Sequence, residues 1–274
     1  MRVALIISTY QWPAALRAVL HSVRAQTRRP DEVLIADDGS GEETAATLQE
    51  FRDLPLAHVW HPDEGFRLAE IRNKAIAAAR SSYLISIDGD MLLHPRCVAD
   101  HLACARPGSF VQGSRIPLSE ERSAALLADP GALPAWWQSG VRRRWKQWRS
   151  LTLARCLAWP SRDPLSVRGC HQAFWREDLL AVNGFDGEMQ GWGREDNELA
   201  ARLIHAGVVR RNLRQAAIAW HLWHPERSRA QLSANDGILQ RTLTTRATRC
   251  VHGIDRWLAD PARWIRADWR PSAR

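Results

Sequence analysis

The chain has 274 residues, enough for one large domain or two small ones, because hydrophobic cores stop growing near about 250–300 residues. Its composition, 45% hydrophobic and 25% charged, is typical of a globular protein and excludes a largely disordered chain. The net charge of +8 favours an anionic partner, such as a nucleotide, a nucleic acid or an acidic membrane face.

The first half of the chain alternates predicted strands and helices. Apolar runs predict strands at 2–9, 32–36, 56–60, 83–87 and 110–114. Helical spacing predicts helices from Pro13, over 42–51, over 68–80 and from Pro95. Repeated strand–helix units imply a parallel sheet with helices on both faces. Ligands bind such sheets beyond the carboxyl ends of the strands.

The composition changes between residues 130 and 162. Seven basic residues occur there without one carboxylate, interleaved with five tryptophans: Trp136, Trp137, Trp145, Trp148 and Trp159. The pattern then predicts a strand at 167–174, short and longer helices at 177–182 and 195–206, and a strand at 216–220. After about residue 225 the chain is Arg-rich and helical in pattern.

No stretch approaches the roughly 18 apolar residues that span a bilayer, and the apolar run at 3–7 is too short for a signal peptide. We therefore expect the chain to stay in the cytoplasm. Its five cysteines form no C-x-x-C pair, so reduced and mostly buried thiols are expected rather than disulfides or a zinc knuckle.

Acidic residues follow two of the predicted strands, Asp37-Asp38 after one and Asp88-Gly89-Asp90 after another. With a small residue between them, Asp88 and Asp90 can both face one hard cation, and Mg²⁺ or Mn²⁺ prefer such oxygen ligands. The alternative is a turn in which the acids only cap backbone groups. The position after an apolar strand in a strand–helix pattern favours the metal.

Two histidines, His221 and His224, come just after the predicted strand at 216–220. Imidazole suits Mn²⁺ as well as Zn²⁺, so one of them could complete a metal shell begun by Asp90. The residues alone leave open which histidine it is, and each could instead be an ordinary core or surface residue.

The string Gly191-Trp192-Gly193-Arg194-Glu195-Asp196 is the most specific in the chain. Its glycines allow close backbone approach, Trp192 offers a flat apolar face for a sugar ring, and two acids open a helix. Acids are common there for structural reasons, because the helix dipole stabilises them. The same position favours the ionised form that a general base needs, but also lowers its basicity.

These strings occur in the order found in a known family. Ile7-Ser8-Thr9-Tyr10, Ala36 to Ser40, Gly65 to Ala69 with Arg72-Asn73, Asp88-Gly89-Asp90 and the Gly-Trp-Gly-Arg-Glu-Asp string together resemble glycosyltransferase family 2. The second half is similar to that of chondroitin-synthesising and β-1,4-galactosyltransferases. The resemblance covers about residues 2–226 and implies an α/β GT-A fold, Rossmann-like with a mostly parallel central sheet, helices on both faces and a helical C-terminal extension.

The resemblance also implies roles for individual residues. Thr9, Asp37 and Asp38 would hold the base and ribose of a nucleotide, and Arg67 and Arg72 would lie near it. Asp88 would contact ribose or metal, and Asp90 would bind Mn²⁺ or Mg²⁺ with His224, with His221 as a second candidate ligand. Trp192 and Gly193 would contact a sugar, Glu195 a sugar hydroxyl, and Asp196 would be the catalytic base. Relatives commonly have Asn at His171, so no role is assigned to that residue.

The implied organisation has four parts: a nucleotide-sugar-binding half at 1–115, a Trp/Arg-rich helical insertion at 116–165, an acceptor and catalytic half at 166–226, and a helical extension at 227–274. The implied activity is inverting, metal-dependent transfer of a hexose or N-acetylhexosamine. The donor would be a nucleotide diphosphate sugar, with UDP favoured, and the acceptor a cell-surface glycan or lipid-linked glycan such as lipopolysaccharide or capsule.

Other functions explain the sequence less well. A nucleic-acid-binding protein would not place acids at strand ends, where they repel phosphate, so no nucleic-acid partner is expected. A nucleotidyltransferase would need a Gly-rich loop after the first strand, which residues 8–12 do not form. A glycan-binding or scaffold protein with an inactive GT-A fold remains the alternative. The Trp/Arg-rich stretch suits peripheral contact with an anionic membrane at the inner face of the plasma membrane; equally, its tryptophans could pack on the main domain.

Overall fold

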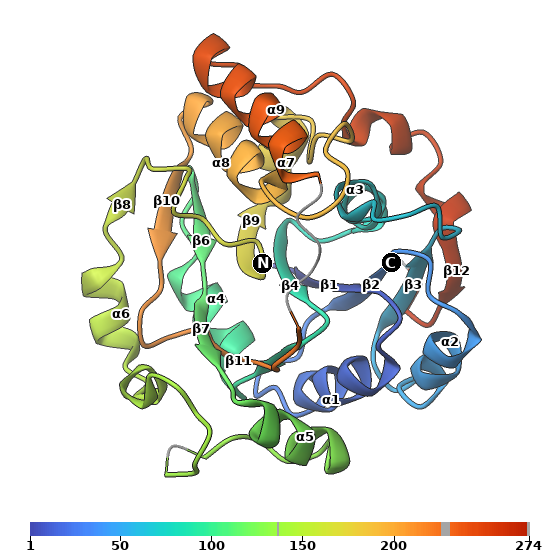
Figure 1. Cartoon of the computed structure of the whole chain (residues 1–274), viewed down its shortest axis with the longest axis vertical. Helices are drawn as coiled ribbons and strands as arrows, with labels where there is room; N and C mark the ends of the chain where they lie inside the picture. Colours follow the sequence, from blue (N-terminus) through green and yellow to red (C-terminus); the bar gives the residue numbers. More distant parts are fainter. Residues whose placement is uncertain (136, 226–230, 273–274) are drawn as a thin grey trace.

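The computed structural model describes residues 1–135, 137–225 and 231–272. A nine-stranded sheet crosses the molecule in the order β12-β3-β2-β1-β4-β9-β6-β10-β8, and a three-stranded sheet has the order β5-β11-β7 (Figure 1). The strands are β1 (Val3–Thr9), β2 (Glu32–Asp37), β3 (Leu56–Trp60), β4 (Tyr83–Asp88), β5 (Met91–Leu93), β6 (Ser109–Gln112), β7 (Ser114–Pro117), β8 (Pro160–Ser161), β9 (His171–Trp175), β10 (Val209–Asn212), β11 (Ile218–His221) and β12 (Ile265–Asp268).

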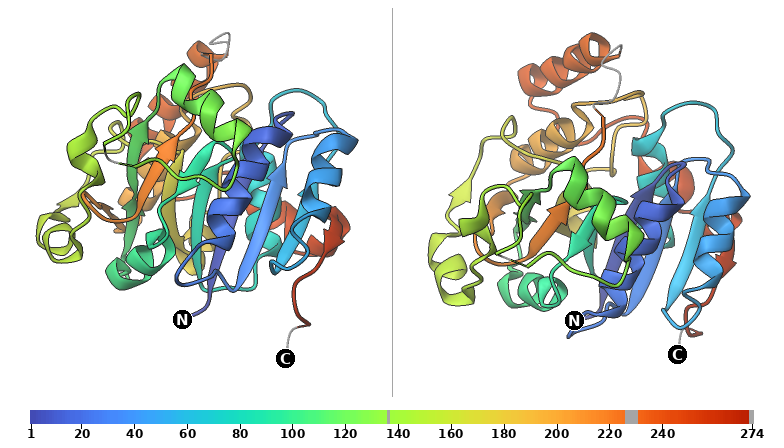
Figure 2. Two further views of the ribbon diagram at one scale, coloured as in Figure 1. Left: turned by 90° about the horizontal axis from the view of Figure 1, so that it is seen from below. Right: turned by 60° about the horizontal axis from the view of Figure 1, so that its bottom comes forward.

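Helices cover both faces of the large sheet (Figure 2). They are α1 (Pro13–Arg24), α2 (Glu42–Gln49), α3 (Leu68–Ala78), α4 (Cys97–Cys104), α5 (Glu120–Ala128), α6 (Leu151–Leu157), α7 (Arg176–Ala181), α8 (Glu195–His205) and α9 (Leu232–Thr245). Three short 3₁₀ helices add Arg144–Gln147, Ile254–Trp257 and Pro261–Trp264. No helix among the described residues is long and apolar enough to cross a membrane.

The central strand β1 shows how the sequence pattern builds this core. All seven of its residues are buried, as expected for a parallel strand covered on both sides. Its alternate side chains enter two different clusters: Leu5 packs with α1, α2 and α4, whereas Ile6 packs with α3, α7 and α8. The α/β prediction with helices on both faces is therefore confirmed.

The sheet is mixed, with its parallel strands grouped at the centre. Neighbours β3, β2, β1 and β4 run parallel, whereas β9 runs antiparallel to both β4 and β6. This arrangement gathers the carboxyl ends of β1, β2 and β4 at one edge. Because β9 runs the other way, the start of β9 lies at that same edge.

Several boundaries differ from the predictions. The expected strand at 110–114 is two strands, β6 and β7, which belong to different sheets and are separated at Gly113. The strand expected at 167–174 begins only at His171. Strands β5 and β10 were not predicted, because runs of three and four residues carry too little periodicity.

The segments at 116–165 and 227–274 are less uniformly helical than their sequences suggested. The first contains α5 and α6, but also β8 and long irregular stretches. The described part of the second contains α9 and β12, and β12 pairs antiparallel with β3 to add an edge strand to the large sheet. The four residues of β12 alternate between apolar and polar, but so short a run is too weak to predict a strand, and its pairing with β3 is a tertiary contact.

Candidate active site

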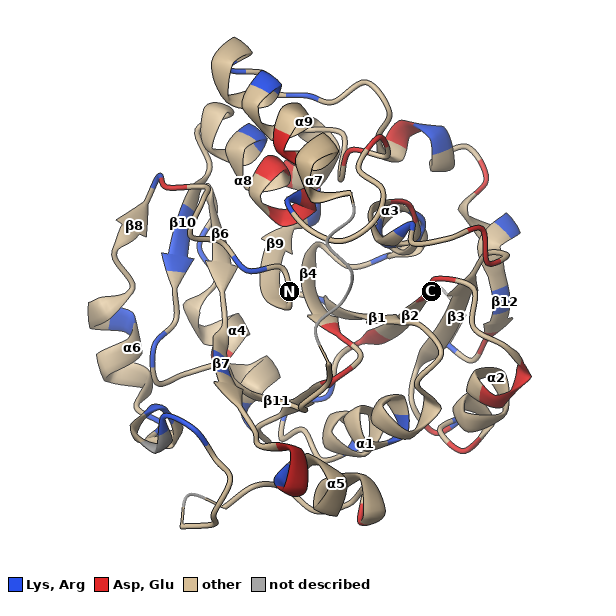
Figure 3. Ribbon diagram, viewed as in Figure 1, with Lys and Arg blue, Asp and Glu red and all other residues tan. Residues whose placement is uncertain are grey.

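A cleft of about 640 Å³ opens at the carboxyl edge of the parallel strands. Its walls come from the ends of β1 and β4, the segment just before β9, the Gly-Trp-Gly loop with the start of α8, and the end of β11. Acidic segments follow β2 and β4 and open α8 in Figure 3. The cleft lining includes these sequence-predicted residues: Thr9, Asp38, Arg72, Asp88, Asp90, Trp192, Gly193, Glu195, Asp196, His221 and His224.

The turn after β4 depends on the glycine between its two acids. The backbone N–H of Gly89 donates to the carbonyl of Ser8 at 2.7 Å, which ties the turn to β1. A Cβ atom at position 89 would lie 2.8 Å from that same oxygen, so any larger residue would push the turn away. Gly89 thus holds Asp88 and Asp90 at the edge of the sheet.

Strand pairing brings both histidines to Asp90. Strand β5 starts directly after Asp90, and antiparallel β11 places His221 opposite Met91. The Nε2 atom of His224 lies 3.2 Å from Asp90 Oδ2, and that of His221 lies 3.5 Å from it. The candidate ligand atoms of the three residues all lie within 4.8 Å of one another.

The chemistry of these three groups fits a divalent cation. Burial lowers the pKa of His221 to about 4, so its imidazole is neutral, which is the ligand form. Burial alone would raise the pKa of Asp90, but the hydrogen bond from His224 and nearby positive charges lower it overall. Asp90 Oδ1 is buried and has no hydrogen-bond partner among the described residues. One carboxylate and two imidazoles suit Mn²⁺.

Arg72 is a buried guanidinium that connects the two acidic parts of the cleft. It donates from Nη2 to Asp88 Oδ1 at 2.8 Å and from Nε to Ser8 Oγ at 3.1 Å. Its Nη1 atom lies 3.5 Å from Glu195 Oε1 and forms no hydrogen bond with any described residue. Burial raises the pKa of Asp88, and Arg72 opposes that rise. Arg72 therefore orients carboxylates from β4 and α8 around one cavity.

Three residues with left-handed backbone shape the loop before α8. Gly191 has φ 73°, Gly193 has φ 107°, and Arg194, which is not a glycine, has φ 77°. The bend ends at Glu195, the first residue of α8, so both acids of the string enter the cleft. Trp192 also lines the cleft and is 41% exposed, as a residue that meets a sugar face should be.

Asp196 lies against the backbone of another glycine. A Cβ atom at Gly169 would lie 3.1 Å from Asp196 Cβ, and the Asn197 N–H donates to Asp196 Oδ1 at 2.8 Å. Burial raises the pKa of Asp196 to about 7, and the negative charge of Glu195 adds to the rise. The rise outweighs the decrease in pKa that the position of Asp196 at the start of a helix predicted. A carboxyl group with such a pKa is suited to general base catalysis near neutral pH.

Asp37 and Asp38 have separate surroundings. Asp37 is fully buried, with His58 Nε2 2.8 Å from Oδ2 and the Ser40 N–H donating to Oδ1 at 2.8 Å, and it does not line the cleft. Asp38 does line the cleft, held by His61 Nε2 at 2.7 Å. Asp37 thus stabilises the loop that presents Asp38.

Arg67 reaches the site only through its backbone. Its N–H donates to Asp38 Oδ2 at 3.0 Å, whereas its guanidinium donates to the Pro62 carbonyl and pairs with Glu64 at 2.9 Å. Arg115 is a lining cation that the sequence pattern missed, and its Nη2 atom lies 3.2 Å from His221 Nε2. The predicted strand ended at Ser114, one residue before Arg115. The sequence pattern therefore did not place Arg115 on the strand, β7, that directs it toward the cleft.

The Trp/Arg segment, residues 136–159, presents large aromatic side chains to solvent. Trp137, Trp145, Trp148 and Trp159 are each between 63% and 74% exposed. Basic residues gather on the stretch between α5 and α6 (Figure 3), and Arg142 and Arg143 are exposed. Trp136 lies outside the described residues. The four described tryptophans therefore present most of their side-chain surface to solvent.

Family models and known proteins resemble this chain over most of its length. The model described as glycosyl transferase family 2 matches residues 4–159, and that described as the N-terminal domain of galactosyltransferase matches residues 161–224. Chondroitin synthase of Escherichia coli is 27% identical over 80% of this chain and 34% of its own length. Validoxylamine A glucosyltransferase of Streptomyces hygroscopicus subsp. limoneus is 30% identical over 75% of this chain and 48% of its own.

The fold also resembles that of a solved structure. The structure of S. aureus TarS residues 1–349 in complex with UDP-GlcNAc superposes with a TM-score of 0.61 at 15% identity, covering 82% of this chain and 60% of that one. This likeness shows the shared fold. The chain spans about a third to a half of the length of the two curated relatives.

Proposed function

The chain belongs to glycosyl transferase family 2, and on that premise we propose that it moves a hexose or N-acetylhexosamine from a UDP sugar to a hydroxyl group of a glycan acceptor, with inversion at the anomeric carbon. One observation carries the proposal. The same cleft contains a set of cation ligands, Asp90 with His221 and His224, and a buried carboxyl group, Asp196, whose pKa is about 7.

Asp196 acts as the general base in this proposal. It takes the proton from the acceptor hydroxyl as that oxygen bonds to the anomeric carbon and the bond from that carbon to the diphosphate breaks. A single displacement of this kind inverts the anomeric configuration. Glu195, with Oε2 buried and unpartnered among the described residues, would accept a hydrogen bond from a sugar hydroxyl.

Asp90, His221 and His224 would hold Mn²⁺ or Mg²⁺ beside the donor diphosphate. A bound divalent cation supplies charge stabilisation for the departing diphosphate. Arg115 adds a positive charge on the same side of the cleft. Arg72 keeps Asp88 and Glu195 in place, so its own contribution is to orientation as much as to charge.

The donor would enter along β1. Thr9 and Asp38 line that part of the cleft and would contact the nucleoside, with Asp88 at the ribose. UDP is supported by the fold shared with a protein solved with UDP-GlcNAc. Trp192 and Gly193 would contact the transferred sugar or the acceptor through the flat face of the indole and the open backbone.

The acceptor would be presented at a membrane surface. Exposed tryptophans and arginines on the Trp/Arg segment favour the headgroup layer of an anionic bilayer, where an indole ring can bury and a guanidinium can meet phosphate. We therefore propose a lipid-linked or lipopolysaccharide-type glycan as acceptor and a peripheral position at the inner face of the plasma membrane.

A panel of nucleotide sugars tests the proposed activity. The purified protein, with and without Mn²⁺, should slowly release nucleotide from one or two UDP sugars even without acceptor. The alternative, a glycan-binding protein with an inactive fold, predicts no release from any donor. If calorimetry also shows no binding of UDP or GDP in the presence of Mn²⁺, the transferase proposal is wrong.

A further inference from the structure

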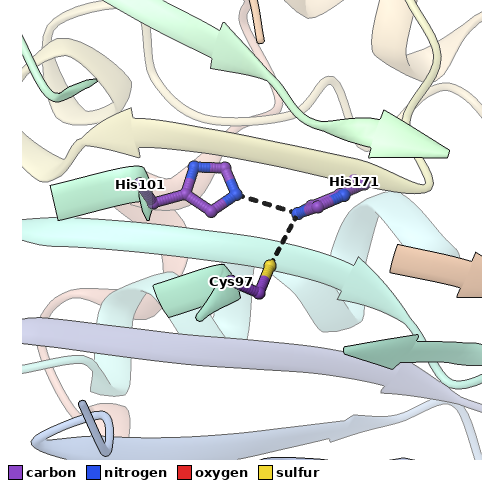
Figure 4. A group of neighbouring side chains, drawn as sticks. All are labelled: Cys97, His101 and His171. Atoms are coloured by element: carbon purple, nitrogen blue, oxygen red, sulfur yellow. Dashed lines mark hydrogen bonds between the residues drawn. The ribbon is translucent and has the colours of Figure 1, made fainter. Parts of the chain in front are cut away.

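A second cluster of metal-binding side chains lies in the core, outside the cleft. Cys97 and His101 are one turn apart on α4, and His171 is the first residue of β9. All three are fully buried, and Figure 4 shows them converging on one another from the helix and the strand. The candidate ligand atoms of the three lie within 4.8 Å of one another.

One atom of the cluster, His171 Nε2, has two neighbours but can form a good hydrogen bond with only one of them. His171 Nε2 lies 2.8 Å from His101 Nε2 and 3.7 Å from Cys97 Sγ. This nitrogen has either one hydrogen or one lone pair, so it cannot serve both neighbours well. The Nδ1 atom of His101 is buried and unpartnered among the described residues, whereas the His171 ring also meets the backbone of Ser114. An ordinary core would satisfy such groups.

The distances are close to those of a coordinated ion. Bond lengths near 2.3 Å to sulfur and 2.0–2.1 Å to nitrogen place tetrahedral ligand atoms about 3.6 Å apart for S and N, and about 3.3 Å apart for two N. The observed S–N distance of 3.7 Å needs almost no change. The N–N distance of 2.8 Å must widen by about half an ångström, which small ring rotations supply.

The ring of His171 is held in the ligating direction. A Cβ atom at Gly113 would lie 2.3–2.6 Å from three atoms of this ring, so the glycine makes room for the imidazole. Burial lowers the pKa of His101 well below its usual value and that of His171 to about 4, so both rings are neutral. Neutral imidazoles offer lone pairs to a cation.

We infer that Cys97, His101 and His171 bind one thiophilic d¹⁰ metal ion, Zn²⁺ or Cu⁺, which fastens α4 to β9 behind the cleft. One thiolate and two imidazoles are ligand types that both ions accept, and Zn²⁺ would take one further ligand to complete its usual four. The thiolate forms by loss of the Cys97 proton to solvent as the ion binds. Because the site is buried on all sides, the ion enters during folding and its role is structural. The site is separate from the proposed Asp90 site, and the inference does not depend on the proposed transferase activity.

Metal analysis of the full chain tests the inference. The protein is purified without added metals, treated with EDTA to remove loosely held ions, and assayed for zinc and copper by mass spectrometry. We expect about one ion of Zn²⁺ or Cu⁺ per wild-type chain, and the element found identifies the ion. Cys97→Ala and His101→Ala should each lose at least nine-tenths of it.

Cys104→Ala is the matched control, because Cys104 is also a buried thiol of α4 but lies outside the cluster. It should keep the full metal content. If the ligand variants fail to fold, a second experiment uses the wild-type chain. The chain is unfolded, freed of metal with a chelator and refolded with Co²⁺, and it should then show a thiolate-to-cobalt charge-transfer band. A metal-free wild-type protein without that band, or equal metal in Cys97→Ala and Cys104→Ala, overturns the inference.

Discussion

His224 Nε2 lies 3.2 Å from Asp90 Oδ2, although the two residues belong to opposite halves of the chain. Pairing of β11 with β5 creates this contact, because β5 begins at the residue after Asp90 and the Leu222 N–H donates to the Asp90 carbonyl at 3.0 Å. The backbone thus delivers a histidine-bearing segment from the second half to an acidic turn from the first.

Removing either histidine should weaken the binding of the metal ion that donor cleavage requires. Loss of even an indirect metal contact typically costs 10–100-fold in metal affinity, so His224→Ala and His221→Ala should each raise the Mn²⁺ concentration for half-maximal nucleotide release by at least about tenfold. His252→Ala, an exposed histidine outside the cleft, is the control. An unchanged Mn²⁺ dependence in both cleft variants would remove them from the metal site.

Asp196→Asn should abolish transfer while preserving binding. The amide cannot accept the acceptor proton, so turnover should fall by about 10²–10⁴-fold. Calorimetry should still detect UDP binding with Mn²⁺, because the nucleotide and cation contacts are untouched. Asp163→Asn, at an exposed position away from the cleft, controls for the change in charge. Turnover near that of the wild type would mean that another group is the base.

The rate should rise with pH through neutrality. Burial holds the pKa of Asp196 at about 7, so below that pH the carboxyl group is protonated and cannot act as a base. As pH increases, the ionised fraction and kcat/KM should increase together and then level off. A nearby bound cation favours the ionised form, so saturating Mn²⁺ should move the midpoint downward. A rate that falls between about pH 6 and 8 would contradict this assignment.

The C-terminal extension should support the donor site through Lys74. The Lys74 ammonium lies 3.6 Å from the ring centroid of Trp264 and 2.9 Å from His61 Nδ1, while His61 Nε2 bonds to Asp38. Trp264→Ala should lower the free energy of unfolding by about 1–3 kcal/mol, from lost cation–π attraction and packing. With Asp38 less well held, the KM for donor should rise more than kcat falls.

Denaturant unfolding and donor kinetics measure these two effects. Trp264→Phe keeps an aromatic face beneath the ammonium and should retain most of both properties. Val251→Ala, an exposed position in the same extension, should change neither. A KM for donor that stays the same in Trp264→Ala would show that the extension does not support Asp38.

The Trp/Arg segment should bind anionic vesicles. Wild-type protein should float with liposomes that contain phosphatidylglycerol but not with neutral ones, and high salt should weaken the association. Replacing Trp145 and Trp148 together by Ala should strongly reduce flotation. Trp269→Ala, which removes a half-buried tryptophan near β12, should not. The membrane proposal is wrong if the protein floats equally with neutral and anionic vesicles, or if it floats with neither.

Local patterns predicted the candidate site to a large degree. The loop before α8 needs glycine because its backbone is left-handed, a local requirement that makes its sequence string informative. The need for Gly89 comes instead from close approach to Ser8 on β1, which is distant in the chain. The order of strands and helices in the first half followed from apolar periodicity in the same way. Of the predicted site residues, Asp37 and Arg67 are absent from the cleft lining: Asp37 is buried against His58, and Glu64 and Pro62 engage the side chain of Arg67.

What the sequence by itself determined is the family, the parallel centre of the sheet and the residue types of the cleft, since each depends on short-range spacing. Tertiary structure alone decided that both histidines reach Asp90, that β12 completes the sheet edge, and that burial raises the pKa of Asp196 to about 7. It also brought His171 to Cys97 and His101. These outcomes depend on contacts between distant segments and on exclusion of water, and neither leaves a periodic signal in the chain.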